Sequence, residues 1–341
     1  MKILAVETSC DETSAAVVLG NKEGNLKILS NIISSSLPLH SKTGGIIPET
    51  AAREQLKLVI PVIDHALEKA KIKDPKKELD KIAVTIGPGL IGSLLVGVET
   101  AKTLSFVLKK PIIPINHLLG HIYANFVATN HKSRVSFPAI VLIVSGGHTD
   151  LLLMKDYKDF KWLGGTRDDA AGEAFDKIGR LLKLPYPGGP SIEKAAKMGN
   201  QKAFNFPKPM IESNDFDFSF SGLKTAVLRE TLKKRLDKKI VSDISASVQK
   251  TIIDVLLKKT LNAAKKYDAK SILLSGGVAA NEKLREQFMQ DTKYQIPNTK
   301  LFIPIKSLCT DNAAMIGAAA YFMGKEVSFE KVDAIPDLYF N

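Results

Sequence analysis

The sequence contains very few cysteines and no long apolar run. Cys10 and Cys309 are its only cysteines, which excludes a disulfide framework and fits a reducing cytoplasm. The longest strictly apolar runs, such as residues 139–144, have six residues, whereas a bilayer span needs about 20. Residues 1–6 show neither the apolar core of a signal peptide nor the Arg/Ser-rich character of a transit peptide. We therefore expect a cytoplasmic protein with no membrane contact.

Two common nucleotide-binding signatures are also missing. The sequence has no Gly-x-x-x-x-Gly-Lys-Ser/Thr loop, which excludes a P-loop enzyme. It has no Gly-x-Gly-x-x-Gly that opens a helix, which argues against a dinucleotide-binding fold. Hydrophobic residues make up 45% and charged residues 25% of the chain, the balance of a globular protein. A length of 341 residues favours two domains.

Basic residues outnumber acidic ones, and the excess is uneven. The chain has 48 Lys and Arg against 36 Asp and Glu, a net charge of +12. Residues 229–266 alone carry 11 basic and 4 acidic residues, a local charge of +7. A basic face of this kind suits a polyanion such as RNA. A solvated helix surface explains the same charges, and charge alone favours that simpler interpretation.

Two segments about 140 residues apart share one pattern. Residues 3–9 form an apolar run that ends in a small polar turn, and residues 15–19 resume a strand. Residues 140–144 lead in the same way into Ser-Gly-Gly-His-Thr, and residues 151–154 resume a strand. The repeat predicts a duplicated protein, and two unrelated hairpins are the alternative.

Helices and strands alternate along the rest of the chain. Apolar residues recur at helical spacing in 49–71 and 241–267, whereas 81–86 and 271–274 have the pattern of strands. This alternation predicts an α/β protein with mixed sheets. The expected domains are an N-terminal lobe at 1–135, with helix 311–324 able to pack back on it, and a C-terminal lobe at 136–341 with an insertion near 200–221.

Three turns rich in Ser or Gly each follow a predicted strand, at 8–13, 145–149 and 275–278. Backbone N–H groups in such turns bind phosphate well, and glycine allows a close approach. One such turn is weak support, but three together predict a nucleotide held between two lobes. Asp11 and Glu12 in the first turn could orient a metal ion or a reacting phosphate, although surface carboxylates in turns are common.

His117 and His121 are four residues apart, which on a helix is metal-chelating geometry. Two histidines usually need a third ligand, and Asp311, which we expect to begin a helix, is the carboxylate we choose. An incidental pair of buried histidines is the alternative. A zinc peptidase helix would read His-Glu-x-x-His, and Leu118 stands where that reaction needs its base.

A second acidic group lies in the predicted C-terminal lobe. Asp169, Glu173 and Asp176 would share one helix face by their spacing, without matching cations. Such a face often binds hydroxyl groups or a metal ion. A capped, solvated helix start explains Asp168 and Asp169 equally well.

Taken together, these motifs closely resemble the tRNA N6-adenosine threonylcarbamoyltransferases, the TsaD/Gcp family, and run in order along nearly the whole chain. Besides the histidine pair, the matching stretches include ETSCDET at 7–13, GPGLIGSLLVG at 87–97, SGGHT at 145–149, YPGGP at 186–190, SGGVAAN at 275–281 and TDN at 310–312. The resemblance implies an actin/hexokinase-like (ASKHA) fold of two ribonuclease-H-like lobes with an interlobe nucleotide cleft. The Gly-Gly-His-Thr form at 146–149 and the Pro-Gly-Gly-Pro form at 187–190 resemble the bacterial and organellar branch, and the lack of a transit peptide favours the bacterial one.

The resemblance also implies a reaction: transfer of threonylcarbamoyl from threonylcarbamoyl-AMP to the N6 amine of the adenine adjacent to the anticodon, in tRNAs reading ANN codons. By this resemblance His117, His121 and Asp311 would hold one divalent metal ion, with Fe²⁺ favoured and Zn²⁺ as the alternative. Asp11 is the candidate catalytic residue. The residues implied to bind the adenylate are Ile143, Val144, Ser145, Gly146, Gly147, Asp176, Gly189, Glu193 and Asn281. The implied partners are tRNA, a paralogous lobe-like dimerisation partner and an ATPase of the same pathway.

Two positions depart from the family pattern. Leu119 replaces a usual Glu between the two histidines, and Gln55 replaces a frequent His. Neither change removes an implied metal ligand. The alternative functions are a small-molecule kinase of the same fold and a non-catalytic nucleotide-binding scaffold. A kinase would not need the histidine pair, and a scaffold would not need the complete metal set.

Overall fold

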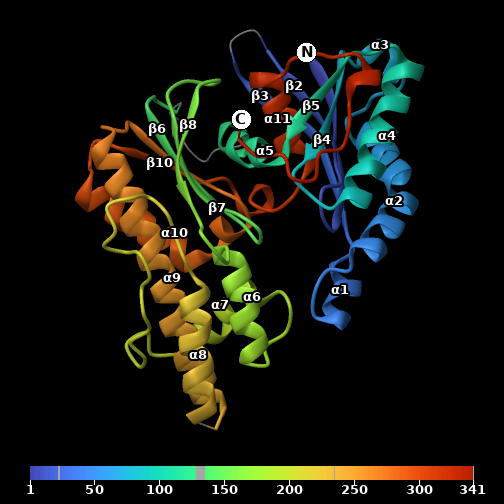
Figure 1. Cartoon of the computed structure of the whole chain (residues 1–341). Helices are drawn as coiled ribbons and strands as arrows, with labels where there is room; N and C mark the ends of the chain where they lie inside the picture. The colour runs from blue at the N-terminus through green and yellow to red at the C-terminus, as the bar shows by residue number, and fades with distance from the viewer. Residues whose placement is uncertain (22–23, 128–134, 234, 341) are drawn as a thin grey trace. The chain divides into compact units, whose positions relative to one another are not determined.

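The computed structural model describes residues 1–21, 24–127, 135–233 and 235–340 (Figure 1). The chain divides into two compact units, one of Met1–Lys132 with Pro304–Asn341 and one of Ser133–Ile303. The whole segment Pro304–Asn341, and not only the helix expected at 311–324, lies with the first unit.

Each unit contains a five-stranded mixed sheet, and the two sheets have the same strand order and sense. The first has the order β3-β2-β1-β4-β5, with β1 antiparallel to β2 and parallel to β4. The second has the order β8-β7-β6-β9-β10, with β6 antiparallel to β7 and parallel to β9. The strands are β1 Lys2–Glu7, β2 Glu12–Gly20, β3 Leu26–Ser35, β4 Lys81–Gly87, β5 Ile112–Asn116, β6 Ala139–Val144, β7 Thr149–Met154, β8 Phe160–Gly165, β9 Ser271–Ser275 and β10 Lys300–Phe302. The structure thus contains the duplication that the repeated strand–turn–strand pattern predicts.

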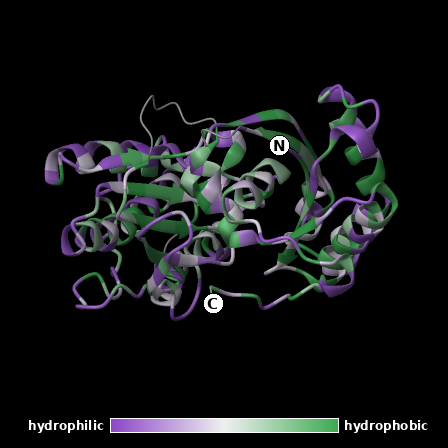
Figure 2. Ribbon diagram, turned by 90° about the horizontal axis from the view of Figure 1, so that it is seen from above, coloured by the Kyte–Doolittle hydropathy of each residue, from purple (hydrophilic) through white to green (hydrophobic). Residues whose placement is uncertain are grey.

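Helices cover both faces of the first sheet. On one face α2 (Pro48–Lys69) and α4 (Ile91–Leu108) form a core with the buried side chains Leu4 and Val6 of β1. On the other face α5 (His117–Tyr123) packs beside α11 (Ala313–Met323). A side chain at Gly317 of α11 would collide with Val18, so this glycine lets the helix approach the sheet closely. Burial of both faces explains the nearly continuous apolar strands, which are green in Figure 2.

Helix α4 is long and apolar enough, by length and composition alone, to cross a membrane. Its side chains Leu94, Val98 and Ala101 are fully buried, and two of them belong to the core between α2, α4 and the first sheet. A core helix passes the same test as a membrane span, and this packing identifies α4 as part of a folded core.

The second unit contains most of the remaining helices. Its long helix α9 contacts α7, α10 and strand β6. The helices are α6 Ala171–Leu181, α7 Gly188–Ala196, α8 Ser221–Lys233, α9 Lys238–Lys266 and α10 Glu282–Gln295; the first unit also has the short α1 Leu37–Thr43 and α3 Pro75–Glu78.

The segment near 200–221 is irregular, as expected, but it is anchored in the core of the second unit. Phe206, Phe216, Phe218 and Phe220 are buried. Lys259 of α9 is also buried, and it donates to Ser213 Oγ at 2.6 Å and to the carbonyl of Asp215 at 2.9 Å. These contacts hold the segment against the long helix.

Candidate active site

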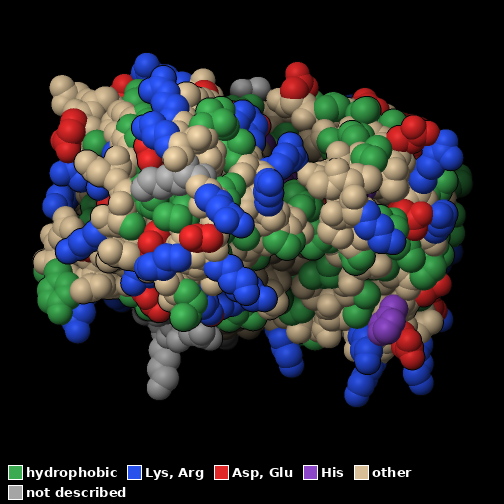
Figure 3. Space-filling view, turned by 90° about the horizontal axis from the view of Figure 1, so that it is seen from below, with side chains coloured by type: hydrophobic (Ala, Val, Ile, Leu, Met, Phe, Trp, Pro, Cys, Tyr) green, Lys and Arg blue, Asp and Glu red, His purple; other side chains and the backbone are tan. Residues whose placement is uncertain are grey.

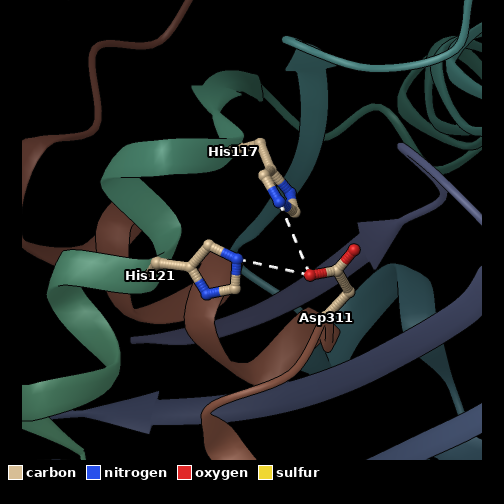
Figure 4. Close-up of side chains that lie close together, drawn as sticks. All are labelled: His117, His121 and Asp311. Atoms are coloured by element: carbon tan, nitrogen blue, oxygen red, sulfur yellow. Dashed lines mark ion pairs between the residues drawn. The ribbon is translucent and has the colours of Figure 1, made fainter. Parts of the chain in front are cut away.

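His117, His121 and Asp311 meet at one point of the first unit (Figure 4). Both histidines lie on α5, and their Nε2 atoms are 3.5 Å and 3.3 Å from Asp311 Oδ1. One ligand atom from each of the three residues lies within 4.8 Å of the others, so a single metal ion could bind all three. Two imidazoles and a carboxylate are a donor set that suits Fe²⁺ or Zn²⁺. The residues present therefore fit a metal ion.

The carboxylate of Asp311 comes from the turn before α11 rather than from the helix itself. We expected Asp311 to begin a helix, but α11 begins at Ala313 and Asn312 caps it by accepting a hydrogen bond from Met315 N. Because Asn312 takes the capping position, the Asp311 side chain is free to turn toward α5. It keeps 22% of its surface exposed, whereas His121 keeps 1%.

A second carboxylate orients His117 from behind. Glu7, at the end of β1, is fully buried, and its Oε2 lies 3.0 Å from His117 Nδ1. Ser9 Oγ lies 3.1 Å from the same nitrogen, and Thr85 Oγ1 donates to Glu7. With Nδ1 donating to Glu7, His117 Nε2 faces Asp311, where a metal ion would bind. Such an outer carboxylate fixes the ring of a metal-binding histidine.

The charges of His117, His121, Asp311 and Glu7 determine how these groups are protonated. Burial alone would lower the pKa of His117, but the charges of Asp311 and Glu7 raise it to about 9. Burial and the charge of His117 lower the pKa of His121. Burial would raise the pKa of Asp311, but its contacts with both histidines hold it below the usual value. One histidine is therefore charged and the other neutral at neutral pH.

We expect metal affinity to rise with pH, because an incoming ion must displace a proton from His117. Below the pKa of about 9, one displaced proton per ion raises the apparent affinity about tenfold per pH unit. Zn²⁺ titrations against a chromophoric chelator at several pH values between about 6.5 and 8 measure this slope. An affinity that does not change over this range would contradict a protonated His117.

The turn between β1 and β2 adds further acidic groups near Asp311. Burial and then the charges of Asp311 and Asp11 raise the pKa of Glu12. Burial and the charge of Asp311 also raise the pKa of the Cys10 thiol. Asp11 itself is buried, and its carboxylate also raises the pKa of both neighbours. A cation bound at this site would reduce the repulsion among these carboxyl groups.

In the second unit, the two glycine turns lie side by side at the ends of neighbouring parallel strands. Ile143 and Val144 end β6 and are fully buried. A side chain at Gly276, after β9, would approach the carbonyl of Val144 to 2.5 Å, and Gly276 has a φ of +90°. In contrast, a Cβ atom at Gly146 or Gly147 would meet nothing within 4 Å. The backbone of this turn is therefore open to a ligand.

Contacts between helices connect the other predicted adenylate residues of this unit. Asp176 on α6 accepts from Gly188 N, at the start of α7, at 2.7 Å. Glu193 on α7 accepts from Glu282 N, at the start of α10, at 2.8 Å. Asn281 caps α10 by accepting from Leu284 N. Burial raises the pKa of Asp176, although the N–H groups of α7 oppose the shift.

Space for a ligand exists at the start of α7 and between α7, α9 and α10. A Cβ atom at Gly189 would meet nothing within 4 Å. A pocket of about 440 Å³ between α7, α9 and α10 is lined by Glu193 and by Gln249, whose Oε1 accepts from Asn281 Nδ2 at 3.0 Å. The second unit thus leaves open space at Gly146, Gly147 and Gly189, and hydrogen bonds join Asp176, Glu193 and Asn281 to the starts of α7 and α10.

The interpretation of Asp169, Glu173 and Asp176 as an unpaired acidic helix face was wrong. Lys177 binds Asp169 Oδ1 at 2.7 Å and Glu173 Oε1 at 2.9 Å. Asp169 also precedes α6, which begins at Ala171. Only Asp176 of the three contacts the start of α7, so the group separates into an ion-pair cluster and one carboxylate next to a helix N-terminus.

Sequence reasoning missed Glu7, Ser9 and Gln55 as residues that support the site. Glu7 had a usable signal, because a charged residue that ends a fully apolar strand must find a partner when buried. Ser9 and Gln55 had none, since their contacts join segments far apart in the sequence.

Comparison with known proteins gives consistent matches. The family model described as TsaD, tRNA N6-adenosine threonylcarbamoyltransferase, matches residues 27–318. A curated protein of that name from Listeria welshimeri is 48% identical over 341 residues, covering 98% of this chain and 96% of its own. Another from Thermosipho melanesiensis is 50% identical over 338 residues, covering 99% of each.

A solved structure supports the fold alone. Full-length HypF, in a phosphate- and nucleotide-bound form, aligns with a TM-score of 0.60 and 14% identity over 93% of this chain. This chain spans only 45% of that protein. The two sheets of equal strand order, the family match and this similarity together confirm the α/β, actin/hexokinase-like fold with two ribonuclease-H-like units. The comparisons give no support for the kinase alternative.

Proposed function

Because the chain belongs to the family of tRNA N6-adenosine threonylcarbamoyltransferases, we propose that it transfers threonylcarbamoyl from threonylcarbamoyl-AMP to the N6 amine of the adenine adjacent to the anticodon, in tRNAs reading ANN codons. The observation that carries the proposal is near full-length similarity to these enzymes in a chain whose His117, His121 and Asp311 come together. In this reaction the amine nitrogen bonds to the carbamoyl carbon. The bond from that carbon to the phosphate oxygen breaks, AMP leaves and the amine loses a proton.

The residues of the two units have separate tasks in this proposal. The turn at 143–147 with Asp176, Gly189, Glu193 and Asn281 binds the adenylate, for which its open glycines and helix-start contacts are suited. Backbone N–H groups of such a turn can hold phosphate or a developing oxyanion. Asp11, buried in the turn beside the metal-binding residues, is the proposed catalytic carboxylate, which orients the metal ion or the reacting phosphate.

His117, His121 and Asp311 would hold one divalent ion per chain, with Fe²⁺ favoured and Zn²⁺ as the alternative. When bound, the ion supplies positive charge to a carbonyl or phosphate oxygen of the donor. Glu7 keeps the His117 ring in the orientation that this binding needs.

The partners in this proposal are tRNA, a paralogous lobe-like protein that dimerises with this chain, and an ATPase of the same pathway. Exposed apolar side chains on α2 and α4 support a protein partner: Leu56, Ile60, Ile91 and Leu95 are each 44–70% exposed. The two helices are in contact there, since a Cβ atom at Gly92 would lie 3.1 Å from Ala52 Cβ. A cytoplasmic location and the lack of a membrane contact stay predictions.

The test is a reconstituted transfer assay. Purified protein is incubated with threonine, bicarbonate, ATP, the synthase that makes the adenylate, and unmodified tRNA, and modified adenosine is measured by mass spectrometry. The result expected is N6-threonylcarbamoyladenosine in tRNA, with few turnovers until the partner proteins are added. No modified adenosine with all partners present would refute the function, and rapid turnover by the isolated chain would refute the dependence on partners.

We also propose that tRNA docks partly through residues 229–266. Several of their basic side chains are paired within the unit: Lys250 binds Asp254, Lys239 binds Asp243, and Lys259 is buried. Figure 3 shows basic side chains mixed with acidic ones on the surface. Arg235, Lys238 and Lys258 are exposed and form no ion pair among the described residues, so they are available for RNA. Lys233 and Lys239 are also exposed, although each pairs with an acidic residue of its own helix.

Changing Lys233, Lys234, Lys238 and Lys239 to Glu is expected to weaken tRNA binding and to flatten its salt dependence. Of these, Lys234 lies outside the described residues. Each lost phosphate contact reduces the slope by about 0.7–0.9 log units per log unit of salt. Filter binding at several salt concentrations measures the slope, and AMP binding is the control. Unchanged affinity and slope would leave this stretch as a solvated helix surface.

A further inference from the structure

Gln55 makes an unusual set of hydrogen bonds beneath the turn between β1 and β2. It lies on α2, is fully buried, and its Nε2 donates toward three backbone carbonyls, those of Thr8 at 3.3 Å, Cys10 at 3.0 Å and Glu12 at 2.9 Å. The amide nitrogen has only two hydrogens, so three carbonyls share them. Its Oε1 is buried with no hydrogen-bond partner in the described part of the chain. Among the described residues, the Gln55 side chain thus forms all of its hydrogen bonds through Nε2.

The three carbonyls alternate with the residues that matter for the site. Ser9, between Thr8 and Cys10, contacts His117 Nδ1 at 3.1 Å. Asp11, the proposed catalytic carboxylate, lies between Cys10 and Glu12. Because the Gln55 amide holds the carbonyls of residues 8, 10 and 12, it restricts the positions that Ser9 and Asp11 can take.

We propose that Gln55 is a positioning residue, whose amide holds the turn at 8–12 in the shape that places Ser9 against His117 and Asp11 at the reaction. The part concerning Asp11 rests on the proposed function, whereas the part concerning Ser9 and His117 does not. Without the amide, the carbonyls of Thr8 and Glu12 would lose this donor and the carbonyl of Cys10 would lose one of two, which is costly in a buried turn, so the turn would move toward other partners. Ser93 Oγ also donates to the carbonyl of Cys10, so the turn would shift rather than unfold.

Gln55 also departs from the histidine that the resembling family often has here. A neutral imidazole offers one N–H group and a charged one offers two, so a histidine could replace the amide as a donor. A methionine has a similar length and no donor. The two substitutions therefore separate the effect of losing the hydrogen-bond donor from the effect of changing the side-chain volume.

The experiment compares Gln55→Met and Gln55→His, with Lys57→Met, an exposed change on the same helix, as the matched control. The first readout is the affinity for Zn²⁺ alone, by competition with a chromophoric chelator. Gln55→Met is expected to bind Zn²⁺ about 10-fold more weakly, the loss typical of groups that orient metal ligands, and Gln55→His to stay within about threefold of the natural chain.

The second readout is the transfer assay with all partners. Gln55→Met is expected to lower kcat about 10-fold or more and to change the KM for threonylcarbamoyl-AMP by less than about twofold. The reason is that the proposed adenylate residues all belong to the other unit. Because a smaller folded fraction would also lower the apparent kcat at constant KM, kcat is expressed per mole of protein that is folded by circular dichroism.

Wild-type Zn²⁺ affinity and kcat in Gln55→Met would overturn the proposal. So would equal losses in Gln55→Met and Gln55→His, because the donor would then not be the cause. If Gln55→Met does not fold, by circular dichroism, Gln55→His decides: near-natural Zn²⁺ affinity supports the proposal and a loss above about 10-fold overturns it. An inactive natural chain would refute the proposed function, while the Zn²⁺ comparison would still test Gln55.

Discussion

Replacing both histidines, in the variant His117→Ala/His121→Ala, is expected to abolish metal binding and threonylcarbamoyl transfer while the fold persists. The variant removes two of the three side chains that converge on one point. Loss of an outer group that only orients a ligand already costs roughly 10- to 100-fold in metal affinity, so the loss of two ligands should exceed that. Elemental analysis after dialysis, circular dichroism and the reconstituted transfer assay measure the three effects.

The controls follow from the contacts of each ring. His117→Ala leaves the fully buried Glu7 without its histidine partner, which itself can lower stability. His121→Ala and Asp311→Asn leave that pair intact, so they show the loss of metal without this added cost. His65→Ala removes an exposed histidine of α2 and should change nothing. A double variant that keeps its full metal content would show that these residues are not the ligands.

The sequence predicted the fold well because the two sheets depend on local patterns. The apolar runs at 3–6 and 140–144 are buried strands in the structure, and each is followed by a short turn and an antiparallel partner. The long helix predicted at 241–267 is α9, three residues longer at its start. Periodicity alone did not show that Pro304–Asn341 packs with the first unit, because that depends on contacts between distant segments.

The pairing of His117 and His121 was predictable for a related reason, whereas the contacts that support the pair were not. His117 and His121 have the spacing that places two side chains on one helix face, and helix α5 does so. Glu7 reaches His117 from a position 110 residues away, and Gln55 reaches Glu12 across 43 residues. The local pattern could show that Glu7 needs a buried partner, but which residues meet is set by the packing of α2 and α5 around the sheet.

Substitutions of the two adjacent glycines at the start of α7 are also expected to have large effects. They separate an effect on the stability of the fold from an effect on ligand binding. A Cβ atom at Gly188 would lie 2.5 Å from Asp176 Cα and from the carbonyl of Phe175, both backbone atoms of α6. Gly188→Ala must therefore push the two helices apart, at a cost of about 1–3 kcal/mol in the free energy of unfolding. A Cβ atom at Gly189 meets nothing within 4 Å, so Gly189→Val should leave the melting temperature nearly unchanged.

Gly189→Val should instead weaken binding of AMP, the adenylate part of the proposed donor, because the new side chain would occupy the space through which a ligand approaches the α7 backbone. If the overpacking cost of about 1–3 kcal/mol weakens the binding free energy of AMP rather than the stability of the fold, the dissociation constant for AMP rises roughly 5- to 150-fold. Isothermal titration calorimetry with AMP and differential scanning calorimetry measure the two variants side by side. Natural AMP affinity in a folded Gly189→Val protein would place the adenylate away from α7, and Asp176, whose carboxylate contacts the same helix start, would then lose its proposed role as well.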